Sequence, residues 1–415
     1  MAKRSVKPSS VGPSNAAEAI TTSVLDITPS LQKIMPGATL ASNNTSEWTY
    51  VDFCDPKTGL PCLPLEYLFG MRGYLCGRVL KWEADEGVGK SSLSLLSFGM
   101  GQKTKNAWCM QLESEDAEMP ENRIWDLGCD PARMWRNPVT ELVKCFEDIN
   151  TFTRAIRDTH DPNKTRPIMI VVDSISNLAE NEMDDDILKK DSDASLLDQV
   201  DFTKNQPGKH ARFLSQWFRN GGTALLKKKD VFLMLVGQLK NTIPMGPTSY
   251  LPPEKKTLGG AAVNFHSTFR VQVQASKLLE KEKQVGDTIT MYTEKNKIAP
   301  RRKRVSFDLY TVGGFDLMSG VIGCLTQSHD GHGEKLFDVK LNGGWYTWSE
   351  LSDKNMRAPD LAEKLYAHQD LLMSVRERMR IYGYGFDFEK KYGIEQAEAD
   401  FDKTEAEEAV SESPK

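Results

Sequence analysis

The sequence predicts an α/β protein built around a largely parallel β-sheet with helices on both of its faces. Two observations lead to this prediction. Between residues 77 and 319, helical patterns alternate with apolar strand-like runs at 78–82, 107–112, 168–172, 231–236, 269–273 and 288–293. Continuous apolar strands that alternate with helices are typical of parallel sheets buried on both faces. The first run also passes through a short glycine-containing turn into apolar residues at 93, 95, 96 and 98, a spacing that suits the buried side of a helix.

Length and composition set the outer bounds. The chain has 415 residues, enough for two or three domains, and its 39% hydrophobic and 27% charged content is ordinary for a soluble protein. No apolar run approaches the length of a membrane span, and the basic N-terminus has no apolar segment behind it, so we expect no membrane partner and no secretory signal. The seven cysteines are odd in number and include no Cys-x-x-Cys pair, which favours reduced thiols in the cytoplasm and argues against zinc.

Composition and charge divide the chain into five parts. Residues 1–15 are basic and rich in Ser and Pro, and are expected to form a disordered arm. Residues 16–50 contain a helical pattern too short to stand alone, so this segment must pack on another surface. The core is expected at 51–320, and a smaller α+β domain at 321–390 with a helix over 361–380. An acidic tail follows at 391–415; residues 395–415 alone contribute −6 to the total charge of −5, which leaves +1 for the rest.

The turn after the first run has the composition of a phosphate-binding loop. A strand, a tight turn and a helix N-terminus present backbone N–H groups to anionic oxygens, Lys90 can reach terminal phosphates, and Ser91 can bind Mg²⁺. Ala84 stands where the usual pattern opens with glycine, which is tolerable only if its φ is negative. The alternative is a chance Gly-Lys-Ser at a strand–helix junction. The residues expected to hold the nucleotide are Asp85, Glu86, Gly87, Val88, Gly89, Lys90, Ser91 and Ser92.

Two of the apolar strands end in acids. Asp173 closes the run that begins at 168, and in a doubly wound sheet this end lies beside the phosphate loop, where Asp173 could hold the water shell of Mg²⁺ opposite Ser91. Glu113 closes the run that begins at 107 and could orient the water that attacks a γ-phosphate, with Glu115 as a competitor. The alternatives are an Asp that forms a turn or caps a helix, and a solvated acidic segment.

The run from 231 ends in a neutral amide, Gln238, which can hydrogen-bond a γ-phosphate without adding repulsive charge. It opens segment 240–258, which with 180–208 is one of two long interruptions of the alternation, and such loops are usually functional or disordered. Segment 240–258 would then move with the nucleotide state. It combines lysines, such as Lys240, with apolar residues, such as Ile243, a mixture suited to single-stranded nucleic acid. An ordinary solvated loop is the alternative.

Taken in order, these motifs resemble those of the RecA-family recombinases of bacteria and bacteriophages. The resemblance runs from about residue 20 to residue 350, and several ordered motifs are far more specific than one. It implies a RecA-like P-loop ATPase core with a mixed, mostly parallel sheet, an N-terminal polymerisation segment at 16–50 and a small α+β C-terminal domain. The motifs are the lead-in Gly59-Leu-Pro-Cys-Leu-Pro, the phosphate loop, Glu113, Asp173-Ser174, Gln238, Gly259-Gly-Ala-Ala-Val-Asn-Phe265 and Lys295-Asn-Lys-Ile-Ala-Pro300.

The resemblance also implies roles for individual residues, with ATP and Mg²⁺ as cofactors. Glu113 would be the catalytic acid, Lys90 would contact the phosphates, and Gln238 would couple the γ-phosphate to a second DNA-binding loop at 240–258. Lys295 and Lys297, at i and i+2 of a strand and so on one face, would reach the ATP of a neighbouring subunit. Segment 180–208 would be the first DNA-binding loop. The residues that contact DNA would be Arg212, Arg219, Lys240, the base wedge Ile243, Gly259 and Gly260.

A protein of this kind would be a DNA-dependent ATPase that forms homo-oligomeric helical filaments on single-stranded DNA and exchanges strands with a homologous duplex. Single-strand-binding and mediator proteins would be further partners. Two alternatives stay open: a ring helicase or motor on the same fold, and a weakly catalytic recombination mediator. The sequence also departs from the family pattern. The first loop is acidic, Ala261 and Asn264 replace a polar and a basic residue, and the adenine-stacking side chain is unassigned, with Arg123 and Trp125 as candidates.

Overall fold

The computed structural model describes residues 49–115, 119–179, 209–242, 254–257, 260–330 and 333–379. The expected disordered arm, nearly all of the 16–50 segment, the first candidate loop at 180–208, the centre of the second loop and the acidic tail lie outside the described residues. The described residues of the expected core and of the 321–390 region fall in one compact unit, Thr49–Asp387. The domain boundary near residue 320 stays a prediction.

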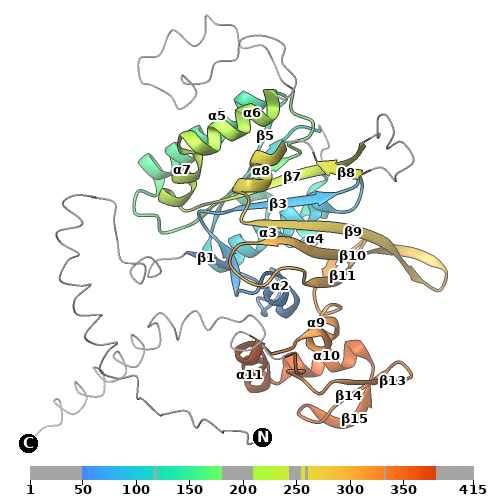
Figure 1. Ribbon diagram of the computed structural model, residues 1–415. Helices are drawn as coiled ribbons and strands as arrows, with labels where there is room; N and C mark the ends of the chain where they lie inside the picture. The colour runs from blue at the N-terminus through green and yellow to red at the C-terminus, as the bar shows by residue number, and fades with distance from the viewer. Residues whose placement is uncertain are drawn as a thin grey trace, which may run out of the picture. The chain divides into compact units, whose positions relative to one another are not determined.

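A ten-stranded sheet forms the centre of the fold (Figure 1). Its strand order is β12-β11-β10-β9-β3-β7-β6-β4-β5, and β8 pairs with β7 off this path. Neighbouring strands from β9 to β5 are parallel, whereas β8, β10, β11 and β12 pair antiparallel. The strands are β3 (Val79–Ala84), β4 (Trp108–Glu113), β5 (Met134–Pro138), β6 (Ile168–Asp173), β7 (Val231–Thr242), β8 (Glu254–Thr257), β9 (Phe269–Glu280), β10 (Lys283–Asn296), β11 (Arg304–Tyr310) and β12 (Gly314–Asp316).

All six predicted runs are strands, which confirms the α/β fold class. The expectation that the last two runs continue the alternation of parallel strands and helices is wrong, because β9 and β10 form an antiparallel hairpin. Lys281 and Glu282 make its turn, and both have positive φ, 48° and 66°. β11 was not predicted, because the predicted strands are all continuous apolar runs. In β11, buried residues alternate with more exposed ones, the pattern of a strand covered on one face only.

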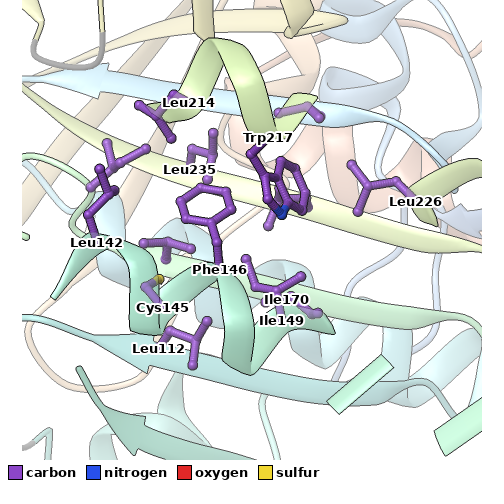
Figure 2. Packing of buried hydrophobic residues seen from close by; sticks show 14 of the residues in the cluster. Leu112, Leu142, Cys145, Phe146, Ile149, Ile170, Leu214, Trp217, Leu226 and Leu235 are labelled. Atoms are coloured by element: carbon purple, nitrogen blue, oxygen red, sulfur yellow. The ribbon is translucent and has the colours of Figure 1, made fainter. Parts of the chain in front are cut away.

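One face of the parallel half is covered by α5 (Leu142–Ala155), α6 (Lys209–Trp217) and α7 (Thr223–Lys228). Figure 2 shows Phe146 of α5 beside Trp217 of α6, with ring centroids 4.7 Å apart, over Ile170 of β6 and Leu235 of β7. These side chains are essentially fully buried. Because each such side chain contributes about 1.5–3 kcal/mol on burial, this cluster firmly fixes β6 beside β7. The carboxyl ends of the two strands are thereby fixed as well.

The opposite face of the sheet is covered by α3 (Lys90–Lys105), as predicted for the helix that follows the phosphate loop. Met169 points to this face, because side chains alternate along a strand and its neighbours point toward α5 and α6. A methyl group at Gly101 of α3 would lie 2.2 Å from the Met169 sulfur, and one at Gly99 would lie 2.3 Å from the carbonyl oxygen of Gly128. The backbone of α3 therefore lies directly against its neighbours.

The remaining elements flank this core. They are β1 (Tyr50–Asp52), α2 (Leu63–Phe69), β2 (Gly73–Leu75), α4 (Glu121–Asp126), α8 (Gly260–His266), α9 (Val321–Gln327), β13 (Lys340–Asn342), β14 (Trp345–Trp348), β15 (Ser352–Met356), α10 (Ala358–Ala367) and α11 (Gln369–Arg378), together with the short helical turns η2 (Pro131–Arg133), η3 (Ile156–His160) and η4 (Phe218–Gly222).

The described region beyond residue 320 contains helices α9, α10 and α11 and the three-stranded sheet β13-β14-β15. The helical stretch predicted over 361–380 consists of two helices, because the chain leaves helical geometry at His368 (φ −103°, ψ 83°), between α10 and α11. Arg376 of α11 forms an ion pair of 2.6 Å with Glu66 of α2, whose side chain is only 1% exposed. This buried pair ties the last described helix to the core.

Two further observations concern the whole described chain. Every cysteine is free and buried. Among the residues that the structure describes, no helix combines the length and the apolar character needed to cross a membrane.

Candidate active site

The phosphate loop lies between the end of β3 and the start of α3. Gly87 and Gly89 have φ of 72° and 85°, a left-handed conformation that other residues adopt only at a cost. Gly89 is the N-cap of α3. Ala84, which replaces the usual first glycine, is the last residue of β3 and does not have a positive φ. The local geometry therefore suits a phosphate cradle, with free N–H groups at the start of a long helix.

Lys90 is folded back over the loop. Its Nζ donates to the carbonyl oxygens of Asp85 at 2.5 Å and Ala84 at 3.4 Å, and the residue is only 7% exposed. Burial lowers the pKa of Lys90, while the nearby carboxylates, chiefly that of Asp173, act in the opposite direction. The ammonium group thus lies inside the loop and within the field of several acids.

The two strand-end acids lie side by side. In the parallel pairing of β4 and β6, Glu113 lies opposite Asp173. Burial raises the pKa of Asp173 to about 6, and the carboxylates of Glu115 and Glu113 add to the rise, whereas the Ser91 hydroxyl and Lys90 oppose it. The Ser91 hydroxyl therefore lies close to the Asp173 carboxylate, where the sequence predicts a metal site.

A divalent cation fits these side chains. A cation would compensate the crowded carboxylates, and carboxylate and hydroxyl oxygens are the ligands that Mg²⁺ prefers. In the described part of the chain, no three His, Cys, Asp or Glu side chains form a metal-binding group of their own.

Gln238 lies within β7, not at its end as expected. The strand continues to Thr242 and pairs with β8 from Leu239↔Thr257 to Thr242↔Glu254. The ends of segment 240–258 are therefore a β-hairpin and not a loop, because the two stretches satisfy each other's backbone hydrogen bonds. Lys240 lies in this hairpin opposite Lys256.

The side chain of Gln238 contacts Glu115 and not Glu113. Its Nε2 donates to Glu115 Oε1 at 2.8 Å, and Asn177 Nδ2 donates to the same oxygen at 3.0 Å. The backbone N–H of Gln238 donates to the Ser176 hydroxyl at 3.0 Å. In the sequence, Glu115 is only an alternative to Glu113 as the acid that orients the attacking water. Glu115 lies two residues past the end of β4, and nothing in the local sequence predicts its contact with Gln238.

Lys295 and Lys297 converge on the C-terminal end of α8. Both ammonium groups donate to the carbonyl oxygen of Phe265, at 3.0 and 2.9 Å, and Lys295 also donates to the carbonyl of Asn264. Cations stabilise helix C-termini, whose last carbonyls have no partner in the helix. Burial, together with Lys297 and Arg270, lowers the pKa of Lys295 to about 8. The expectation that the two lysines stand at i and i+2 of one strand is wrong, because β10 ends at Asn296 and Lys297 follows it. Both ammonium groups nevertheless reach the same carbonyl oxygen.

A basic surface surrounds this point and consists of Arg219, His266, Lys295 and Lys297. Burial lowers the pKa of His266, and the three cations add to the effect, which places them all near it. His266 stacks on Phe218 with ring centroids 4.8 Å apart. Of the other predicted DNA contacts, Arg212 is exposed on α6 and Gly260 begins α8, whereas Ile243 and Gly259 lie outside the described residues.

A buried ion network links the phosphate-loop strand to α8. Lys81 and Glu83 of β3, 0% and 1% exposed, form an ion pair of 2.8 Å. Arg270 of β9 contacts the second oxygen of Glu83 at 2.9 Å, and Lys81 also donates to Asn264 Oδ1 at 2.9 Å. In the sequence this stretch reads as an apolar run. A lysine and a glutamate at alternate positions of a buried strand are the signal that could have revealed the network.

The two candidates for adenine stacking differ in their contacts and exposure. The Arg123 guanidinium donates at 2.9 Å to the carbonyl oxygens of Tyr310 and Thr311 at the end of β11. Trp125, two residues on in α4, is 52% exposed. Arg123 is therefore engaged in fixing α4 to β11.

Known proteins resemble this chain over most of the region just described. The family model described as the RecA N-terminal domain matches residues 57–316, more than half of the chain. Protein RecA of Sulfurimonas denitrificans is 24% identical over 312 residues, which cover 74% of this chain and 80% of that protein. Protein RecA of Wolinella succinogenes is 26% identical over 289 residues (69% and 72%), and that of Petrotoga mobilis 27% over 294 residues (69% and 68%). The matched residues include the phosphate loop, both strand-end acids, Gln238 and the lysine pair, and the chain therefore belongs to the RecA family.

Proposed function

We propose that this protein is an ATP-dependent recombination protein that forms filaments on single-stranded DNA and catalyses homologous pairing and strand exchange in the cytoplasm. The observation that carries the proposal is that one strand, β7, joins the phosphate site to the candidate DNA-binding segment. Gln238 donates to Glu115 beside the phosphate site, and from the next residue, Leu239, the same strand is part of the β7–β8 hairpin. A change at the γ-phosphate can therefore act on the hairpin through a single continuous element.

The phosphate site supports an ATPase. Asp85 to Ser92 would hold the phosphates of ATP with backbone N–H groups and Lys90, and Ser91 with Asp173 would hold Mg²⁺, which neutralises charge on the phosphates. Glu113 would accept a proton from, and so orient, the attacking water. Its place beside Asp173 in the sheet is consistent with this role.

The DNA side of the proposal rests on the basic residues near α8. The DNA backbone would be contacted by Arg212 and Arg219, both exposed, with Gly259, Gly260 and Lys240 close to the strand and Ile243 between bases. Binding through such cations releases counterions, so affinity for single-stranded DNA should fall steeply with salt. Lys295 and Lys297 would contact the ATP of the next subunit, which requires them to leave the carbonyl oxygen of Phe265.

The test is ATP hydrolysis with and without single-stranded DNA, combined with negative-stain images of the same samples. We expect hydrolysis that depends on single-stranded DNA, together with helical filaments that require a nucleotide. Closed hexameric rings would instead indicate a helicase or motor on this fold. Filaments or DNA binding with negligible hydrolysis under all conditions would indicate a mediator.

A further inference from the structure

Asn296 lies between the two lysines that converge on α8, and its side chain closes the turn that carries them. It is the last residue of β10. Its Oδ1 accepts hydrogen bonds from the backbone N–H groups of Ile298 and Ala299, both at 2.9 Å. Its Nδ2 donates to the carbonyl oxygen of Phe69 at 2.8 Å. The amide therefore joins the turn to a residue far away in the sequence and uses most of its hydrogen-bonding capacity to do so.

The partner of this amide belongs to a rigid part of the core. Phe69 is the last residue of α2 and is fully buried, and its ring packs against that of Phe269 with centroids 5.3 Å apart. Phe269 is also the residue of β9 that pairs with Asn296. Asn296 is therefore held by α2 through its side chain and by β9 through its backbone, and close packing keeps these two elements in place.

The turn determines where the second lysine points. Because β10 ends at Asn296, the alternation of a strand does not set the direction of the Lys297 side chain. The Lys297 N–H donates to the carbonyl oxygen of Thr268 at 3.1 Å, and the next two N–H groups are those held by Asn296. The pairing of β10 with β9 is also irregular between Thr293 and Lys295. The two lysines therefore owe their convergence to the turn and not to a regular strand.

We propose that Asn296 is a positioning residue that fixes the backbone from which Lys295 and Lys297 reach the ATP of a neighbouring subunit. The inference rests on the proposed function. In the structure both ammonium groups contact the carbonyl oxygen of Phe265, and in a filament they would exchange it for phosphate oxygens. Because lysine stems are long and flexible, the ammonium groups can only be placed accurately if the backbone that carries them is fixed.

The experiment measures two quantities on the full chain: ATP hydrolysis with saturating single-stranded DNA, and the affinity of dilute protein for a non-hydrolysable ATP analogue with Mg²⁺. Asn296→Ala loses all three side-chain hydrogen bonds, whereas Asn296→Ser keeps a hydroxyl that can accept a hydrogen bond within the turn. The matched control is Thr290→Val. It removes the 2.9 Å hydrogen bond between the hydroxyls of Thr290 and Ser306 from the same strand and leaves the turn intact.

We expect Asn296→Ala to lower DNA-dependent hydrolysis roughly tenfold, because a misplacement of about 1 Å can cost up to about 10²-fold in rate. The affinity of dilute protein for the analogue should not change, since the lysines would act only on a neighbouring subunit. Asn296→Ser should hydrolyse ATP at a rate between those of wild type and Asn296→Ala. Thr290→Val should behave as wild type.

Mixed filaments test whether the effect is exerted on a neighbour. Lys90→Ala subunits keep an intact lysine pair, and Asn296→Ala subunits keep an intact phosphate loop. When equal amounts are mixed, about one interface in four joins an intact loop to an intact pair, because subunits that assemble head to tail present different surfaces to each other. Hydrolysis by the mixture should therefore approach about one quarter of the wild-type rate and exceed that of either variant alone.

Three results would overturn the inference. Unchanged DNA-dependent hydrolysis in Asn296→Ala would mean that the turn does not position the lysines, and an equal loss in Thr290→Val would mean a general weakening of the sheet. A mixture no more active than the mean of its two components would mean that Asn296 acts within its own subunit. Failure of the proposed function differs from all three, because wild type itself would then not respond to DNA or would form no filaments.

Discussion

Two groups of charged side chains, one around β3 and one around the phosphate loop that follows it, are built in opposite ways. In the buried network, Glu83 contacts both Lys81 and Arg270. Burial alone would raise the pKa of Glu83, yet these two cations hold it below its usual value. In the phosphate site, Asp173 is as deeply placed, but Glu115 and Glu113 crowd it and its pKa rises to about 6.

The difference separates a structural charge from a functional one. A buried carboxylate that contacts enough cations is a structural group, because its charge is already compensated in the folded protein. A buried carboxylate among other carboxylates is unfavourable in the free protein and becomes favourable when a cation binds. The crowded group is therefore the one expected to take part in binding.

The largest effect is expected from Lys90→Ala. Loss of the cation that neutralises the terminal phosphates should lower ATP turnover by roughly 10²-fold or more, while the free energy of unfolding changes little. Steady-state hydrolysis with saturating single-stranded DNA measures the first quantity and urea denaturation the second. Lys103→Ala, an exposed lysine on the same helix, is the control. Wild-type turnover in Lys90→Ala would show that this loop is not the phosphate-binding site.

Glu83→Ala tests the other group. It leaves Lys81 buried without its carboxylate, which should reduce the free energy of unfolding by about 3–5 kcal/mol. Urea denaturation of the nucleotide-free protein measures this loss. Replacing both partners, Lys81→Met with Glu83→Leu, should recover most of it, because Arg270 is 26% exposed and can reach water. If the double variant were no more stable than Glu83→Ala, the network would owe its effect to shape and not to charge.

Asp173→Asn should increase the free energy of unfolding, by less than Glu83→Ala decreases it. A carboxyl whose folded pKa is raised destabilises the fold once it ionises. Its penalty is absent below the unfolded pKa near 4, grows as pH rises toward 6, and is fully present above that. In EDTA at pH 8, the variant should thus be more stable than wild type by about 1–3 kcal/mol, and the difference should vanish near pH 4. A gain that persisted at pH 4 would show that ionisation of Asp173 is not the cause.

Lys297→Ala should reduce DNA-dependent ATP hydrolysis, but by less than Lys90→Ala. We expect DNA-dependent hydrolysis to fall roughly tenfold, less than for a lone buried transition-state donor because Lys295 remains. ATP binding by dilute, unassembled protein should not change, since the lysine would act on a neighbouring subunit. An equal fall of hydrolysis in a background that cannot polymerise would place the role of Lys297 within its own subunit.

The sequence was most informative where the backbone itself sets the position of a residue. The phosphate loop, Glu113 and Asp173 lie at the ends of buried strands, and the order of apolar runs was enough to place them. Their chemical roles stay predictions. The helix after the loop was equally predictable, because α3 follows a glycine pair with the apolar spacing of a buried helix.

Contacts between side chains from distant strands could not be predicted. The pairing of Gln238 with Glu115 depends on the order of β4, β6 and β7 and on side-chain conformations that no local pattern encodes. The network around Lys81 was hidden for a related reason: a charged residue inside an apolar run looks like an exception until its partner on β9 is known. The β7–β8 hairpin was overlooked because the end of β7 after Gln238 and the whole of β8 are mostly polar, and pairing rather than burial defines them.

The close seating of α3 limits which parts of the site can move. Even a methyl group is excluded at Gly99 and Gly101, which lie against the carbonyl of Gly128 and the sulfur of Met169. A helix held this tightly cannot slide or rotate without collisions, so the loop at its start is preorganised and loses little entropy when a ligand binds. Any mechanical work that follows from nucleotide binding must therefore begin in side chains such as Gln238, with α3 as the fixed support against which they move.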